Sequence, residues 1–92
     1  MNELITARKI AAQILQQVLD GKISPEEARK RWPECKGDTS LDSAYHTLYH
    51  FEDDVDIRQK DQKYAEWQIG QIERMITSFK TGNSLDDELI KE

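Results

Sequence analysis

The sequence contains a single cysteine, Cys35, so a disulfide bond within the chain is excluded and a reducing compartment is expected. No apolar run approaches the roughly 18 residues that a membrane-spanning helix requires. The first residues, Met1-Asn2-Glu3, lead directly into a charged amphipathic pattern, without the basic and apolar stretches of a secretory signal. We therefore expect a soluble, cytoplasmic protein that does not bind membranes.

Sequence motifs for catalysis are also missing. With four glycines, the chain has neither a glycine-rich phosphate loop nor the nucleophile elbow of hydrolases. A chain of 92 residues, of which 37% are apolar, supplies a thin helical core and leaves little for a deep pocket. We expect a single domain that is not an enzyme and that carries no cofactor.

Acidic residues are concentrated in the middle of the chain. The formal net charge is −5, and residues 34–57 contain seven acidic residues against one basic residue, Lys36. The flanking segments are nearly balanced, with six basic and four acidic residues in 1–33 and six basic and seven acidic residues in 58–92. This local negative charge argues against nucleic acid or an anionic membrane as a ligand, and it favours a basic protein as the partner.

Apolar residues recur at helical spacing over residues 4–19, and Gly21 is placed to end this helix. The residues expected to face the core are Leu4, Ile5, Ile10, Ala11, Ile14, Leu15, Val18 and Leu19. Ser24-Pro25-Glu26-Glu27 then forms a capping box with proline at the first helical position. It predicts a short second helix that ends before Pro33, with Ala28 and Trp32 facing inward.

Two more helices are predicted after a loop over residues 34–40. Asp38, Thr39 or Ser40 can cap the third helix, and its inward residues are Leu41, Ala44, Tyr45, Leu48 and Phe51. The last helix begins near Lys60 or Asp61 and ends at Gly82. Its broad apolar face contains Tyr64, Ala65, Ile69, Ile72, Met75, Ile76 and Phe79. The pattern predicts an all-α fold, a small antiparallel bundle of about four helices over residues 1–82. Residues 83–92 are expected to form either one more turn, capped by Ser84, or a frayed tail.

Four carboxylates lie close together between the last two predicted helices: Glu52, Asp53, Asp54 and Asp56, which we call the acidic corner. Asp56, like Asp61, suits the positive end of a following helix. The other three lie at the end of the third helix, where negative charge is unfavourable, so a functional surface is a natural explanation. A calcium-binding loop is excluded here because position 58 is arginine and the segment around the acidic corner contains no glycine, which the sharp turn of such a loop requires.

Two histidines, His46 and His50, lie four residues apart on the third helix, with Asp42 and Asp54 one step further on each side. Imidazoles at this spacing can bind a transition metal together with a carboxylate. Ordinary ion pairs on a solvated face, between Asp42 and His46 and between His50 and Asp54, are the stronger explanation of the same stripe. We expect the ion pairs and no metal.

Large aromatic rings are numerous for so thin a bundle, and most are expected in the core. Tyr49 and Trp67 lie nearest the edges of their apolar faces, where an aromatic ring can serve as an interface anchor. They are candidate partner-binding residues beside the acidic corner. An alternative function is a helical regulatory module that forms homodimers through these two rings.

The order of features resembles the colicin D immunity-like family of small acidic bacterial proteins. The similarity covers roughly residues 8–80. It comprises Gly21-Lys22-Ile23-Ser24-Pro25-Glu26-Glu27 after the first helix and Phe51-Glu52-Asp53-Asp54-Val55-Asp56 at the end of the third. The resemblance implies a four-helix bundle that binds a tRNA-cleaving toxin domain and covers its basic active site. Carried over to this chain, it places partner-binding residues at Glu52, Asp53, Asp54, Asp56 and Asp61.

Overall fold

The computed structural model describes residues 3–33 and 37–85, and this part of the chain is helical with no strand. Its helices are α1 (Glu3–Leu19), α2 (Pro25–Lys30), α3 (Thr39–Asp53), α4 (Val55–Lys60) and α5 (Gln62–Lys80). The all-α class is therefore confirmed. The regular bundle of about four antiparallel helices stays a prediction, because α4 was not expected as a separate helix.

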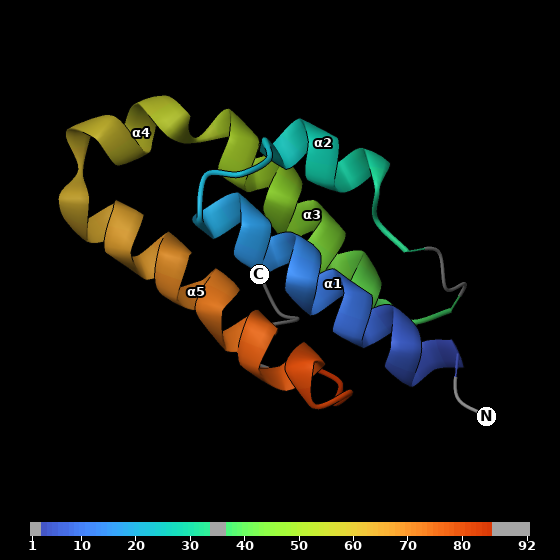
Figure 1. The fold of residues 1–92 in the computed structure, drawn as a ribbon. Coiled ribbons are helices and arrows are strands. Elements are labelled where there is room, and N and C mark those ends of the chain that lie inside the picture. Colours follow the sequence, from blue (N-terminus) through green and yellow to red (C-terminus); the bar gives the residue numbers. More distant parts are fainter. Residues whose placement is uncertain (1–2, 34–36, 86–92) are drawn as a thin grey trace.

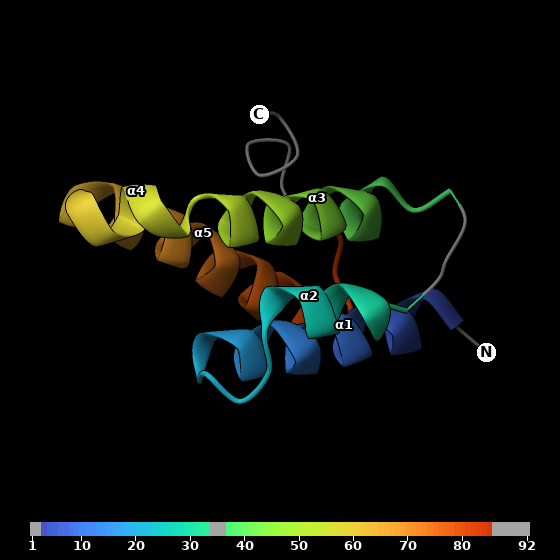
Figure 2. The same ribbon diagram turned by 90° about the horizontal axis from the view of Figure 1, so that it is seen from above.

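The helices pack in pairs. α1 lies along α5 and α2 lies along α3, while α4 joins α3 to α5 at one end of the molecule (Figure 1). In the view from above, α4 continues beyond the end of α3 (Figure 2). This arrangement places the acidic corner at the junction of three helices.

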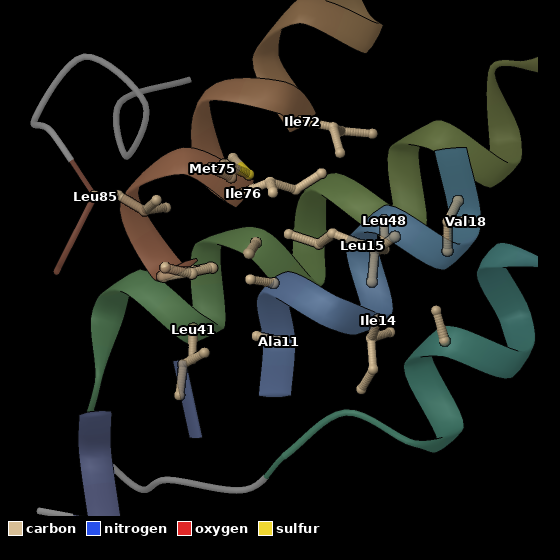
Figure 3. Close-up of a cluster of buried hydrophobic side chains, with 14 of the residues drawn as sticks. Ala11, Ile14, Leu15, Val18, Leu41, Leu48, Ile72, Met75, Ile76 and Leu85 are labelled. Carbon is tan, nitrogen blue, oxygen red and sulfur yellow. The ribbon is translucent and has the colours of Figure 1, made fainter. Parts of the chain in front are cut away.

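The core is formed by apolar side chains from α1, α3 and α5 that point into one interior (Figure 3). Leu15, Leu48, Ile72, Met75 and Phe79 are fully buried. These residues lie on the predicted inner faces of their helices, so the helical periodicity located the centre of the core correctly.

The predicted helix caps are present. The Ser24 hydroxyl accepts a hydrogen bond from the backbone N–H of Glu27, and Asp38, one of three candidates, caps α3 through the N–H of Ser40. Asp38 also accepts hydrogen bonds from Arg8 at 3.2 and 3.3 Å. A single carboxylate thus caps one helix and ties it to another.

Two residues expected to face the core are largely solvent-exposed: Ile10 is 41% exposed and Ile69 is 36% exposed. In Figure 1, the first turns of α5 extend past the end of α1 toward α4. The apolar periodicity continues through these turns and therefore marks Ile69, although its side chain is exposed. The prediction was wrong at both positions.

Packing continues beyond Gly82. Leu85 is buried in the core, and its backbone N–H donates to the Ser40 hydroxyl at 3.0 Å. The predicted turn or tail at the end of the chain falls mainly on residues 86–92, which lie outside the described residues, as does Cys35.

Candidate functional site

The acidic corner is built around the break between α3 and α4. α3 ends at Asp53 and α4 begins at Val55, so Asp54 both follows one helix and precedes the next. Its backbone N–H still donates to the carbonyl of His50, and its own carbonyl accepts from the N–H of Arg58 at 3.0 Å. Asp54 therefore keeps a backbone hydrogen bond on each side of the junction between the two helices.

Glu52 forms an ion pair that links α3 to α2. Arg29 of α2 donates a hydrogen bond to its carboxylate, and this contact raises the pKa of the Arg29 guanidinium. The same guanidinium lies over the ring of Tyr49, 4.9 Å from the ring centre. Glu52 and Tyr49 thus anchor α2 against the end of α3.

Asp54 is also used within the fold, because its side chain turns toward α5. The Tyr64 hydroxyl donates to the Asp54 carboxylate at 2.6 Å, and the Gln68 amide donates to the same oxygen at 3.1 Å. The hydrogen bond from Tyr64 is the main reason that the pKa of Asp54 is lowered, with smaller contributions from Gln68, His50 and Arg58. In turn, the hydrogen bond to Asp54 raises the pKa of Tyr64, with smaller contributions from burial and from the negative charge of Asp54.

Arg58 completes this arrangement from α4. Its guanidinium donates to the backbone carbonyl of Phe51 and, at 2.8 Å, to the side-chain oxygen of Gln68. It also lies 3.6 Å from the centre of the Phe51 ring, and burial lowers its pKa. We call Asp54, Arg58, Tyr64 and Gln68 the corner network.

Sequence reasoning missed the role of Arg58 and Gln68. Gln68 is only 3% exposed, although it is a polar residue. It lies one turn before Ile72 on the inner face of α5, and a glutamine at an inward position is a signal that a buried polar partner exists.

The remaining acidic candidates divide into two kinds. Asp61 accepts a hydrogen bond from the backbone N–H of Tyr64 and so caps α5. Asp53 and Asp56 are exposed, and neither makes an ion pair or side-chain hydrogen bond with any residue of the described ranges 3–33 and 37–85. The acidic corner therefore contains two carboxylates without a partner among the described residues, Asp53 and Asp56, next to Glu52 and Asp54, which stabilise the fold.

Both aromatic candidates are accessible. Trp67 is 59% exposed and packs against the Tyr64 ring, with ring centres 5.7 Å apart, so it lies next to the corner network. Tyr49 is 49% exposed, but Arg29 covers one face of its ring. Trp67 is the more available apolar surface of the two.

The histidine stripe does not form the expected pair between Asp42 and His46. The His46 ring nitrogen Nδ1 contacts the backbone carbonyl of Asp42 at 2.9 Å instead of its carboxylate. His50 acts electrostatically on Asp54, as expected, by favouring its charged form. Within the described part of the chain, no group of three or more His, Cys, Asp or Glu side chains is placed to hold a metal ion.

Comparison with protein-family models, with curated proteins and with solved structures finds no match to this chain. Among the described residues, no helix is both long enough and apolar enough to cross a membrane. The functional interpretation therefore depends on the geometry of the acidic corner.

Proposed function

We propose that this chain is a small binding protein of the immunity type that presents Asp53 and Asp56 to a basic protein partner. One observation carries the proposal, namely that two carboxylates of the acidic corner have partners within the fold and two do not. Glu52 and Asp54 are engaged within the fold, whereas Asp53 and Asp56 face solvent and form no ion pair with any described residue. Two carboxylates at a helix junction with a defined backbone are well suited to steer and orient a positively charged surface.

Trp67 supplies the apolar part of the proposed surface. Interfaces depend on a few large, desolvated anchors, and tryptophan is enriched among them. Trp67 packs on Tyr64, whose hydroxyl bonds to Asp54, the residue next to Asp53. The exposed indole ring and the free carboxylates therefore belong to the same end of the molecule.

The resemblance to the colicin D immunity-like family supports a particular kind of partner. It implies that the carboxylates substitute for the RNA backbone in the basic active site of a tRNA-cleaving toxin domain. Such an inhibitor works by occupying the active site, so it needs no catalytic residues or cofactor of its own.

The test needs a candidate partner, and a basic nuclease domain encoded by a neighbouring gene would be the first choice. Wild-type protein should bind this domain and stop its cleavage of tRNA. The variant Asp53→Asn/Asp56→Asn should associate about ten times more slowly at low salt and lose much of the salt dependence, because exposed charges act mainly on the association rate.

A control variant, Asp42→Asn/Glu73→Gln, removes the same amount of charge from exposed positions away from the corner. It should associate at the wild-type rate. The proposal is wrong if both variants slow association equally, or if the wild-type protein leaves the nuclease active.

A second candidate function is homodimerisation, and the large exposed area of Trp67 is the observation that favours it. In that case, sedimentation should show a mass that doubles as the concentration rises, and Trp67→Ala should abolish the change. A monomer at all concentrations would exclude this alternative.

A further inference from the structure

The surroundings of Arg58 form a nearly complete receptor for a guanidinium group. Two oxygens accept hydrogen bonds from it, the backbone carbonyl of Phe51 and the side chain of Gln68, and the Phe51 ring provides a π face at 3.6 Å. The Asp54 carboxylate contributes the opposite charge. A planar cation that stacks on a ring while donating hydrogen bonds fits this site better than an ammonium group does.

The receptor is built by helices other than the one that supplies the cation. Phe51 belongs to α3 and the buried Gln68 belongs to α5, while Tyr64 and Gln68 of α5 hold the Asp54 side chain. None of these contacts requires Arg58. The receptor should therefore keep its shape when the guanidinium of Arg58 leaves it.

The helix that carries Arg58 is weakly attached. α4 has six residues, none of which is buried, and its apolar residues Val55 and Ile57 are 44% and 47% exposed. Asp54 and Asp61, which lie outside the helices, flank it at each end, and the Asp61 side chain caps α5. A segment with so little buried apolar surface can open locally without unfolding the rest of the domain.

We propose that this receptor binds an arginine side chain of the protein partner, and that Arg58 fills it until the partner arginine takes its place. The inference rests on the proposed function, since a basic partner docked at Asp53 and Asp56 brings its own cations next to the receptor. Arg58 is then an internal competitor that keeps Asp54 and Gln68 satisfied in the free protein. Exchange replaces one guanidinium by another, so no buried acceptor loses its hydrogen bond.

The first experiment tests the receptor without any partner. The variant Arg58→Ala empties it, and methylguanidinium chloride should raise the melting temperature of this variant saturably, by several degrees, because a ligand that binds only the folded state stabilises it. Methylammonium chloride at equal ionic strength should have little effect. The matched control is Arg74→Ala, which removes an exposed arginine from α5 and should show no rise with either salt.

The receptor proposal is overturned if methylguanidinium gives no saturable rise in Arg58→Ala, or if the rise is the same with methylammonium or in Arg74→Ala. Neither result contradicts the proposed function, provided that Asp53 and Asp56 still control association with the basic partner. Conversely, a saturable rise specific to Arg58→Ala upholds the receptor even if those two carboxylates prove irrelevant to binding.

The second experiment uses the wild-type protein, so it tests the receptor even if the variant Arg58→Ala does not fold. Titration with N-acetylarginine amide should shift the NMR signal of the Gln68 side-chain amide and increase hydrogen exchange of the α4 amides, because α4 is released. N-acetyllysine amide is the control and should do neither. Unchanged α4 exchange at concentrations that shift Gln68 would show that Arg58 stays in place and would refute the displacement.

Discussion

The clearest test of the acidic corner compares Asp54→Asn with Asp53→Asn. The two substitutions remove the same charge from adjacent residues, but only Asp54 accepts hydrogen bonds from Tyr64 and Gln68. In Asp54→Asn the amide oxygen can accept both hydrogen bonds, because both reach the same oxygen of Asp54, but the negative charge that strengthens them and that acts on Arg58 is lost. We expect Asp54→Asn to destabilise the fold and Asp53→Asn to leave the free energy of unfolding unchanged or slightly higher.

The size of the effect follows from the charge that these two hydrogen bonds lose. A hydrogen bond to a charged group contributes roughly 1.5–3 kcal/mol, against about 0.5–1.5 kcal/mol for one between neutral groups. Asp54 is half-buried, so solvent weakens the interaction, and a loss of about 1–2 kcal/mol is expected. For a domain of this size, that corresponds to a drop in melting temperature of about 4–15 °C.

The hydrogen bond between Tyr64 and Asp54 also predicts a pH dependence of stability. The pKa of Asp54 lies below its ordinary value of 3.8 in the folded protein, so its stabilising contribution is present above that pH and is lost as the pH falls through the lowered pKa. The pKa of Tyr64 lies above its ordinary value of 10.0, so the contribution is also lost as the pH rises through the raised pKa. Tyr64→Phe should therefore flatten both the acid and the alkaline limb of the stability curve.

The assay is urea denaturation, followed by tryptophan fluorescence and circular dichroism, at pH 7 and at several values between 2 and 5. Asp54→Asn should differ from wild type at pH 7 and converge with it at the acid end. If Asp54→Asn and Asp53→Asn are equally stable at pH 7, the corner network does not hold α3 to α5. The assignment of a structural role to Asp54 and not to Asp53 would then be wrong.

Two further predictions concern the packing. Ile72→Ala should lower the free energy of unfolding by about 2–5 kcal/mol in chemical melts, because this side chain is fully buried, whereas the matched change Ile69→Ala should cost less than about 1 kcal/mol. Gly82→Ala should cost about 1–3 kcal/mol, since the added Cβ would lie 2.7 Å from Cγ2 of Ile5 at a positive φ. Gly21→Ala, also at positive φ but in open space, should cost less. Equal losses within either pair would contradict the packing described.

Features set by neighbouring residues could be predicted from the sequence. The cap at Ser24, the glycine stop at Gly82 and the start of the last helix at Asp61 each depend on side chains within a few positions of the helix end. The inner faces of α1, α3 and α5 follow from periodicity in the same way, because the three helices bury one stripe each.

Features set by contacts distant in sequence could not be predicted. The short helix α4 has no apolar face of its own, so no periodicity marks it, and its position depends on Arg58 reaching Phe51 and Gln68. The pairing of Glu52 with Arg29 likewise depends on α2 packing along α3. An ion pair across 23 positions leaves no trace in local patterning, so the sequence could not separate Glu52 and Asp54 from Asp53.

The helix dipole of α3 gives the last argument for a partner. Glu52, Asp53 and Asp54 all lie where a negative charge opposes that dipole. Arg29 offsets the cost at Glu52, and Tyr64 and Gln68 offset it at Asp54. Asp53 makes no ion pair or side-chain hydrogen bond with any described residue, so we expect this carboxylate to weaken the free protein.

A locally unfavourable residue without compensation inside the fold indicates a use outside it. Asp53→Asn alone should therefore keep or slightly increase stability while slowing association with the basic partner. A clear loss of stability in Asp53→Asn would mean that the carboxylate has a partner within the chain, and the electrostatic argument for a binding surface would then lose its basis.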